Sequence, residues 1–74
     1  MDFYTELANA IVIQAVKDYR KALKTLKRHP HYEPAQATVA EVEEFFHSAW
    51  YRTLTAVDAD MLMTKIRREI NDCA

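Results

Sequence analysis

The sequence predicts a small all-α protein, and three observations support this. Apolar residues recur at spacings of three and four along most of the 74 residues, which is the period of an amphipathic helix. Glycine is absent, and the two prolines, Pro30 and Pro34, lie four residues apart, so residues that break helices are confined to one segment. Half of the residues are hydrophobic and 28% are charged, which is typical of one globular domain, here residues 1–74.

The first predicted helix is a long one, from about residue 2 to residue 28. Val12 and Val16 lie on its apolar stripe, Asp2 is its expected N-cap, and Pro30 ends it. At 1.5 Å per residue this helix would be roughly 35–40 Å long. It would serve as a spine longer than either of the helices that follow it.

A loop and a second helix are predicted next. Residues 29–37 contain both prolines, which bias the residues before them away from the α conformation. Thr38 and Glu41 have the spacing of a capping box, in which the two side chains bond the free N–H groups at a helix start. We therefore expect the second helix from about residue 39 to residue 54.

The third predicted helix covers about residues 58–72, with Asp58 as its N-cap. The two shorter helices are expected to fold back on the spine and to leave part of its N-terminal half uncovered. Leu7, Ile11 and Ile13 lie in that half. We therefore predict a homodimer that buries these three residues.

Charge and cysteine content indicate a cytoplasmic protein without a cofactor. The formal net charge is −1, which gives no overall attraction to nucleic acid or to an anionic membrane. The single cysteine, Cys73, excludes an internal disulfide. The N-terminus lacks a signal-peptide pattern, and no apolar run is long enough to span a membrane.

A basic face is predicted along the first helix. It gathers basic side chains within about a third of the helix circumference, opposite the apolar stripe. Its members are Lys17, Arg20, Lys21, Lys24, Lys27 and Arg28. One interpretation is an ordinary solvated face; the other is a site for nucleic-acid phosphates or for an acidic protein surface.

Four large aromatic residues fall within residues 45–51. Phe45, Phe46 and Trp50 lie on the apolar half of the second helix and are expected in the core. Tyr51 is the exception and points nearly opposite Val42, away from that half. An exposed tyrosine is a candidate anchor for a protein interface.

Metal binding and catalysis are disfavoured. His29, His31 and Glu33 lie close in sequence, but a closed zinc site needs four ligands and the chain has no second thiol. No serine or cysteine lies beside a base at the spacing of a nucleophilic site. A helix-turn-helix is also disfavoured, because Asp58 and Asp60 would direct carboxylates at DNA phosphates.

Two segments, ANAIVIQAVKDYR (residues 8–20) and FFHSxWYxxLTxVD (residues 45–58, where x marks positions outside the resemblance), carry a resemblance to a known group. The chain resembles the small helical orphan proteins of prophages and other mobile elements of Gram-positive bacteria, over about residues 8–66. Those proteins tend to have glycine after the aspartate that is here Asp58, whereas this chain has Ala59. The resemblance implies no site residues.

What the resemblance does imply is a context in which small proteins bind host machinery. Our first functional hypothesis is a non-enzymatic accessory protein that inhibits a bacterial defence nuclease by direct binding, as anti-CRISPR proteins do with a CRISPR effector. A second is a nucleic-acid-associated regulatory or replication protein that uses the basic face. A third is a structural or assembly protein of a phage particle.

Overall fold

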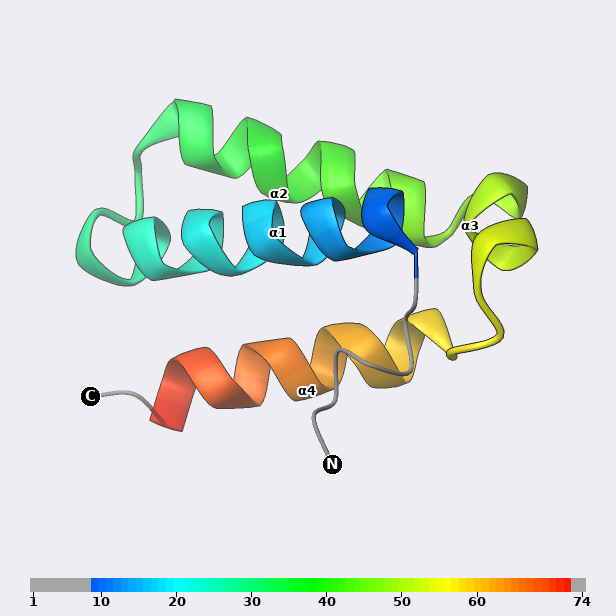
Figure 1. Ribbon diagram of the computed structural model, residues 1–74. Coiled ribbons are helices and arrows are strands. Elements are labelled where there is room, and N and C mark those ends of the chain that lie inside the picture. The colour runs from blue at the N-terminus through cyan, green and yellow to red at the C-terminus, as the bar shows by residue number, and fades with distance from the viewer. Residues whose placement is uncertain (1–8, 73–74) are drawn as a thin grey trace.

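The computed structural model describes residues 9–72, which form four helices and no strand. The helices are α1 (Ala10–Arg28), α2 (Glu33–Phe46), α3 (Ala49–Leu54) and α4 (Ala59–Asp72). Figure 1 shows α1 between α2 and α4, with α2 antiparallel to α1, α4 running in the same direction as α1, and α3 turning the chain from α2 to α4. The all-α class is confirmed, with four helices in place of the three predicted.

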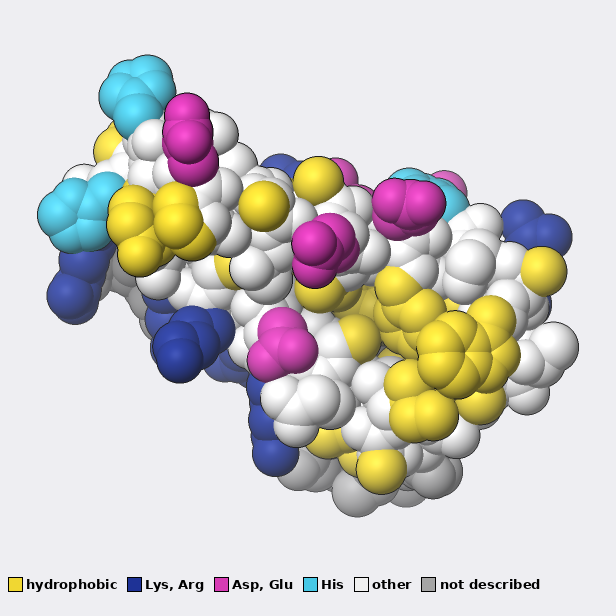
Figure 2. Space-filling view, turned by 90° about the horizontal axis from the view of Figure 1, so that it is seen from above, with side chains coloured by type: hydrophobic (Ala, Val, Ile, Leu, Met, Phe, Trp, Pro, Cys, Tyr) yellow, Lys and Arg dark blue, Asp and Glu magenta, His cyan; other side chains and the backbone are white. Residues whose placement is uncertain are grey.

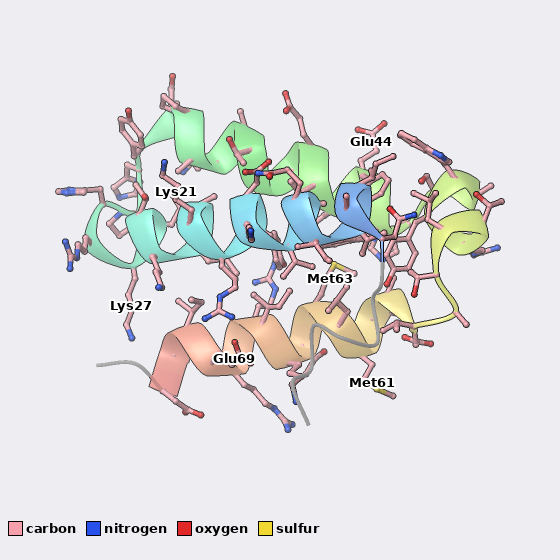
Figure 3. The ribbon with its side chains drawn as sticks, viewed as in Figure 1. Lys21, Lys27, Glu44, Met61, Met63 and Glu69 are labelled. Atoms are coloured by element: carbon pink, nitrogen blue, oxygen red, sulfur yellow. The ribbon has the colours of Figure 1, made fainter. Side chains whose placement is uncertain are left out.

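The core lies where α1 meets the other helices. Val12 and Val16 of α1 and Leu62 and Ile66 of α4 are completely buried, and each such side chain contributes roughly 1.5–3 kcal/mol by leaving water. The buried cluster comprises Val12, Val16, Tyr19, Phe46, Tyr51, Leu62, Met63, Ile66 and Ile70. In Figure 3, Met63 points from α4 toward the interior, whereas Met61 points away from the bundle.

The start of α1 differs from the prediction. Asn9 has extended backbone angles (φ −131°, ψ 123°), and its Oδ1 accepts hydrogen bonds from the N–H groups of Ile11 and Val12. Asn9 is therefore the N-cap, and a helix running unbroken from Asp2 is wrong; Asp2 itself lies outside the described residues. At 1.5 Å per residue, the 19 residues of α1 span about 28 Å and the 14 residues of α2 or α4 about 21 Å. The expected excess length of the spine is correspondingly smaller.

The predicted loop at residues 29–37 is half helix, because α2 already begins at Glu33. Pro34 lies in the first turn of α2, where its missing N–H has no helical partner to lose and its fixed φ suits the helix. Thr38 is inside the helix, and its hydroxyl donates to the Pro34 carbonyl at 3.1 Å. The capping box at Thr38 and Glu41 is therefore wrong.

The predicted second helix is interrupted near its middle. His47 and Ser48 separate α2 from α3, and the Ser48 backbone is extended (ψ 157°). The Ser48 hydroxyl donates to the Phe45 carbonyl at 2.6 Å and accepts from the Tyr51 N–H at 3.2 Å. One side chain thus satisfies both the end of α2 and the start of α3.

The third predicted helix is confirmed as α4. Asp58 caps it as expected, because its Oδ1 accepts a hydrogen bond of 3.0 Å from the Met61 N–H. The carboxylate of Asp60 lies in the first turn, where the helix dipole favours negative charge.

Candidate functional site

A polar network joins α1, α2 and α4 around Tyr19. The Tyr19 hydroxyl, on a completely buried side chain, donates to Glu43 Oε2 at 2.7 Å. Arg67 donates to the same carboxylate oxygen, and its guanidinium lies 5.8 Å from the centre of the Tyr19 ring. Two donors and one charged acceptor therefore satisfy one another at the contact of three helices.

The pKa values of this network favour its present protonation state. Burial, and then the hydrogen bond to Glu43, raise the pKa of Tyr19 to about 12. Burial alone would raise the pKa of Glu43, but the hydrogen bonds from Tyr19 and Arg67 outweigh it and lower that pKa below its ordinary value. At neutral pH Tyr19 is therefore protonated and Glu43 is ionised. Both pKa values move away from neutrality, whereas a general acid or base needs a pKa near it, so the network is a structural cross-link.

Two members of the basic face hold α4 in place. Arg20 forms an ion pair with Glu69 of α4 at 3.0 Å. Lys27 donates from Nζ to the carbonyls of Ile70 and Asn71, at 2.8 and 3.3 Å. Figure 3 shows Glu69 on the side of α4 that faces α1, and Lys27 reaching from α1 toward the end of α4. Because the last carbonyls of a helix lack helical donors, Lys27 caps the C-terminus of α4.

The other four members of the basic face are exposed: Lys17, Lys21, Lys24 and Arg28. We call these four side chains the cationic row. Within residues 9–72 none of them forms an ion pair with an acidic side chain. Figure 2 shows Lys and Arg side chains gathered beside one another along one edge of the molecule.

Two open hollows each have three members of the cationic row in their walls. One, of about 550 Å³, is lined by Ile13, Lys17, Arg20, Lys21 and Lys24. The other, of about 600 Å³, is lined by Lys21, Lys24, Thr25, Lys27, Arg28, His29 and Ile70. Lys21 and Lys24 line both hollows, and among the described residues neither hollow has an acidic side chain in its wall.

The exposed aromatic residue near the end of α2 is Trp50 and not Tyr51. Trp50 is 56% exposed, whereas Tyr51 is 2% exposed and donates from its hydroxyl to the Val57 carbonyl at 2.9 Å. Tyr51 is therefore no interface anchor. On one continuous helix Tyr51 would lie about 180° from Val42, but the break at Ser48 rotates α3 so that Tyr51 turns inward.

Trp50 belongs to an apolar surface at one end of the bundle. Its ring meets Phe45 edge to face, with the ring centres 5.5 Å apart, and Phe45 in turn contacts Phe46 and Tyr51. Ile11, 45% exposed, lies in the first turn of α1 at the same end. Figure 2 shows a patch of hydrophobic side chains there. We call Ile11, Phe45 and Trp50 the aromatic end.

The residues of the predicted dimer surface differ in their exposure to solvent. Ile11 is exposed, as that prediction requires. Ile13 is half-buried, packs against the core and lines a hollow of the cationic row. Leu7 lies outside the described residues.

The histidines and acidic residues do not come together as metal ligands. Within residues 9–72 no three histidine, cysteine, aspartate or glutamate side chains are placed to hold a metal ion. His47 and Asp60 form an exposed pair, with 3.2 Å between Nε2 and Oδ1, which connects the end of α2 to the start of α4. None of the described helices has the length and apolar character needed to span a bilayer.

Trp50 is exposed, and not in the core as predicted, because the predicted helix continues through Ser48, whereas serine is also a preferred N-cap. Starting a new helix after Ser48 changes which residues of 49–54 face the core.

Comparison with protein-family models, curated proteins and solved structures finds no match to this chain.

Proposed function

We propose that this chain is a non-catalytic accessory protein that acts by binding another protein through the aromatic end. The observation that carries the proposal is the exposed ring of Trp50. Tryptophan is enriched among the few residues that dominate the binding energy of protein interfaces. A second apolar side chain, Ile11, is exposed at the same end of the molecule.

The support of Trp50 by other rings strengthens this proposal. Phe45 meets the rings of Trp50 and of the buried Tyr51 edge to face, and it contacts the buried ring of Phe46 at a tilt. Edge-to-face contacts of this kind contribute about 0.5–1.5 kcal/mol each. An anchor that is already ordered loses less conformational entropy on binding than a mobile side chain does.

For the partner, we propose the class implied by the sequence resemblance. In this proposal the chain belongs to a mobile element, acts in the bacterial cytoplasm and inhibits a host defence nuclease, such as a CRISPR effector. The contact would be apolar, because the aromatic end offers aromatic and aliphatic side chains. The likeness of the two sequence segments supports the context, and Trp50 supports the mode of action.

The test is a nuclease cleavage assay with a matched pair of variants. Trp50→Ala removes the proposed anchor, and Tyr32→Ala removes an aromatic ring of similar exposure, 52%, from the start of α2. We expect inhibition by the wild-type protein, a loss of at least about 30-fold in affinity with Trp50→Ala, and little change with Tyr32→Ala.

Circular dichroism and the melting temperature show whether Trp50→Ala is still folded. Equal effects of the two variants would contradict the role of Trp50. If no effector nuclease is inhibited, the inhibitor proposal fails. Binding to another purified protein that depends on Trp50 would then preserve only the proposed mode of action.

A further inference from the structure

The basic face has two separate roles in the folded protein. Arg20 and Lys27 contact α4 through Glu69 and through the carbonyls at its C-terminus. The cationic row lies beside these contacts and is exposed to solvent. Two basic residues therefore hold α4, and the other four are exposed without an ion pair to an acidic side chain among the described residues.

The cationic row is straight and continuous. Its members are at positions i, i+4, i+7 and i+11 of α1, a spacing that keeps side chains on one side of a helix. Eleven residues at 1.5 Å each give the row a length of about 16 Å. Because α1 packs against both α2 and α4, the positions of the four side-chain stems are fixed by the fold.

The surroundings of the row concentrate its positive potential. The two hollows that each hold three members of the row have basic and neutral walls in the described part of the chain. A third hollow, which Lys21 also lines, has Asp18 and Glu41 in its wall. A hollow with walls of one charge sign focuses the field and raises the local concentration of counter-ions. The site therefore favours a ligand with regularly spaced negative charges.

We propose that the cationic row binds the phosphate backbone of duplex DNA without regard to base sequence. A duplex carries one negative charge per about 1.7 Å of axis, so several phosphates come within reach of a row of this length. Over the described residues, the walls of the two hollows contain no phenylalanine, tyrosine or tryptophan ring, and His29 is their one aromatic side chain. Single-strand binding sites rely on such rings for base stacking, so the duplex is the favoured ligand.

The proposal makes a quantitative prediction about salt. Four phosphate contacts give a slope of about −3.6 for the logarithm of the association constant against the logarithm of the salt concentration. Six phosphate contacts, one for each residue of the basic face, would give a slope of about −5.4. The measured slope therefore distinguishes four phosphate contacts from six. Binding should be weak, with a dissociation constant of about 10⁻⁴–10⁻⁶ M, as for other nonspecific contacts.

The test is fluorescence anisotropy of a short labelled DNA duplex, titrated with protein between about 50 and 200 mM salt. Lys21→Gln/Lys24→Gln removes the two lysines that line both hollows. Arg52→Gln/Arg68→Gln removes two exposed positive charges from α3 and α4 and serves as the charge-matched control. The first variant should lose about 1.8 units of slope and, near 100 mM salt, roughly 60-fold in affinity, whereas the control should stay close to wild type.

Several outcomes would overturn the proposal. One is the absence of duplex binding at about 50 mM salt, which would make an acidic protein surface the better candidate partner. Equal losses in the two double variants would show a response to net charge only. Equal or tighter binding of a single strand of the same length would exclude the duplex as the favoured ligand. Trp50→Ala should bind DNA as wild type does, so this result is independent of the proposed function.

Discussion

Replacing Tyr19 by phenylalanine should destabilise the protein through the loss of one hydroxyl. That hydroxyl donates to the Glu43 carboxylate at 2.7 Å inside the contact of α1, α2 and α4. Hydrogen bonds to charged groups contribute about 1.5–3 kcal/mol. Glu43 keeps its bond from Arg67 in the variant, so we expect a loss near the lower end of that range, about 1.5–2 kcal/mol. The melting temperature of a domain this small should fall by about 6–15 °C.

Tyr51 and Tyr32 provide graded controls for urea unfolding followed by circular dichroism. Tyr51→Phe removes a hydrogen bond to the uncharged Val57 carbonyl, for which we expect about 1 kcal/mol. Tyr32→Phe changes an exposed side chain and should alter stability by less than about 0.5 kcal/mol. The expected order of destabilisation is therefore Tyr19, then Tyr51, then Tyr32.

The pH dependence of the Tyr19→Phe effect provides a second check. The pKa of Tyr19 is about 12 in the folded protein and 10.0 is its ordinary value. Above pH 10 the unfolded chain loses this proton before the folded protein does, so stability that is complete below pH 10 is lost as pH rises through 12. By about pH 11 the wild type should lose about 1.4 kcal/mol that Tyr19→Phe does not lose.

Two results would refute this reasoning. One is a Tyr19→Phe variant whose free energy of unfolding lies within about 0.5 kcal/mol of Tyr32→Phe at neutral pH. The other is a difference between wild type and Tyr19→Phe that stays constant as pH rises from neutral to about 11. Either would mean that the hydroxyl does not cross-link the helices.

Three further predictions concern the ends of the helices and the aromatic end. Ser48→Ala should lower the free energy of unfolding by about 1 kcal/mol in urea, because α3 loses its N-cap; no change would show that Ser48 does not stabilise the break. Lys27→Ala should speed amide hydrogen exchange in the last turn of α4 and leave the exchange rates in the middle of α4 unchanged. An equal increase in exchange rate along the whole of α4 would contradict a capping role. Ile11→Glu should convert the predicted homodimer to a monomer in sedimentation velocity at tens of micromolar, and a monomeric wild type would end the dimer prediction.

The all-α class and the apolar stripe of α1 were predictable from the sequence. Val12, Val16 and Tyr19 follow the helical period and are buried. The end of α1 at Arg28 and the cap at Asp58 were also predictable, because the signals lie within a few residues of each helix end. These features depend on local backbone preferences and on spacing along one helix.

Two boundaries were predicted wrongly because the same residue can serve opposite purposes. The two prolines predict a loop at Pro34, but proline also suits the first turn of a helix, and Pro34 lies in the first turn of α2. The helical period predicts Ser48 inside a helix, but Ser48 caps α3. Burial of Phe46 and Tyr51 against α1 and α4 accompanies the break at Ser48, and such packing is not encoded in the local pattern.

By itself the sequence determined which residues could form the basic face and the aromatic segment. Only the tertiary structure decided what each of them contacts. Arg20 and Lys27 bind α4, whereas the cationic row does not. Trp50 is the exposed aromatic residue, whereas Tyr51, which was expected to be exposed, is buried. The physical reason is that exposure depends on contacts between helices. Lys27 and Ile70, for example, are 43 residues apart in the chain, and a periodicity that relates residues three and four apart carries no information about such a contact.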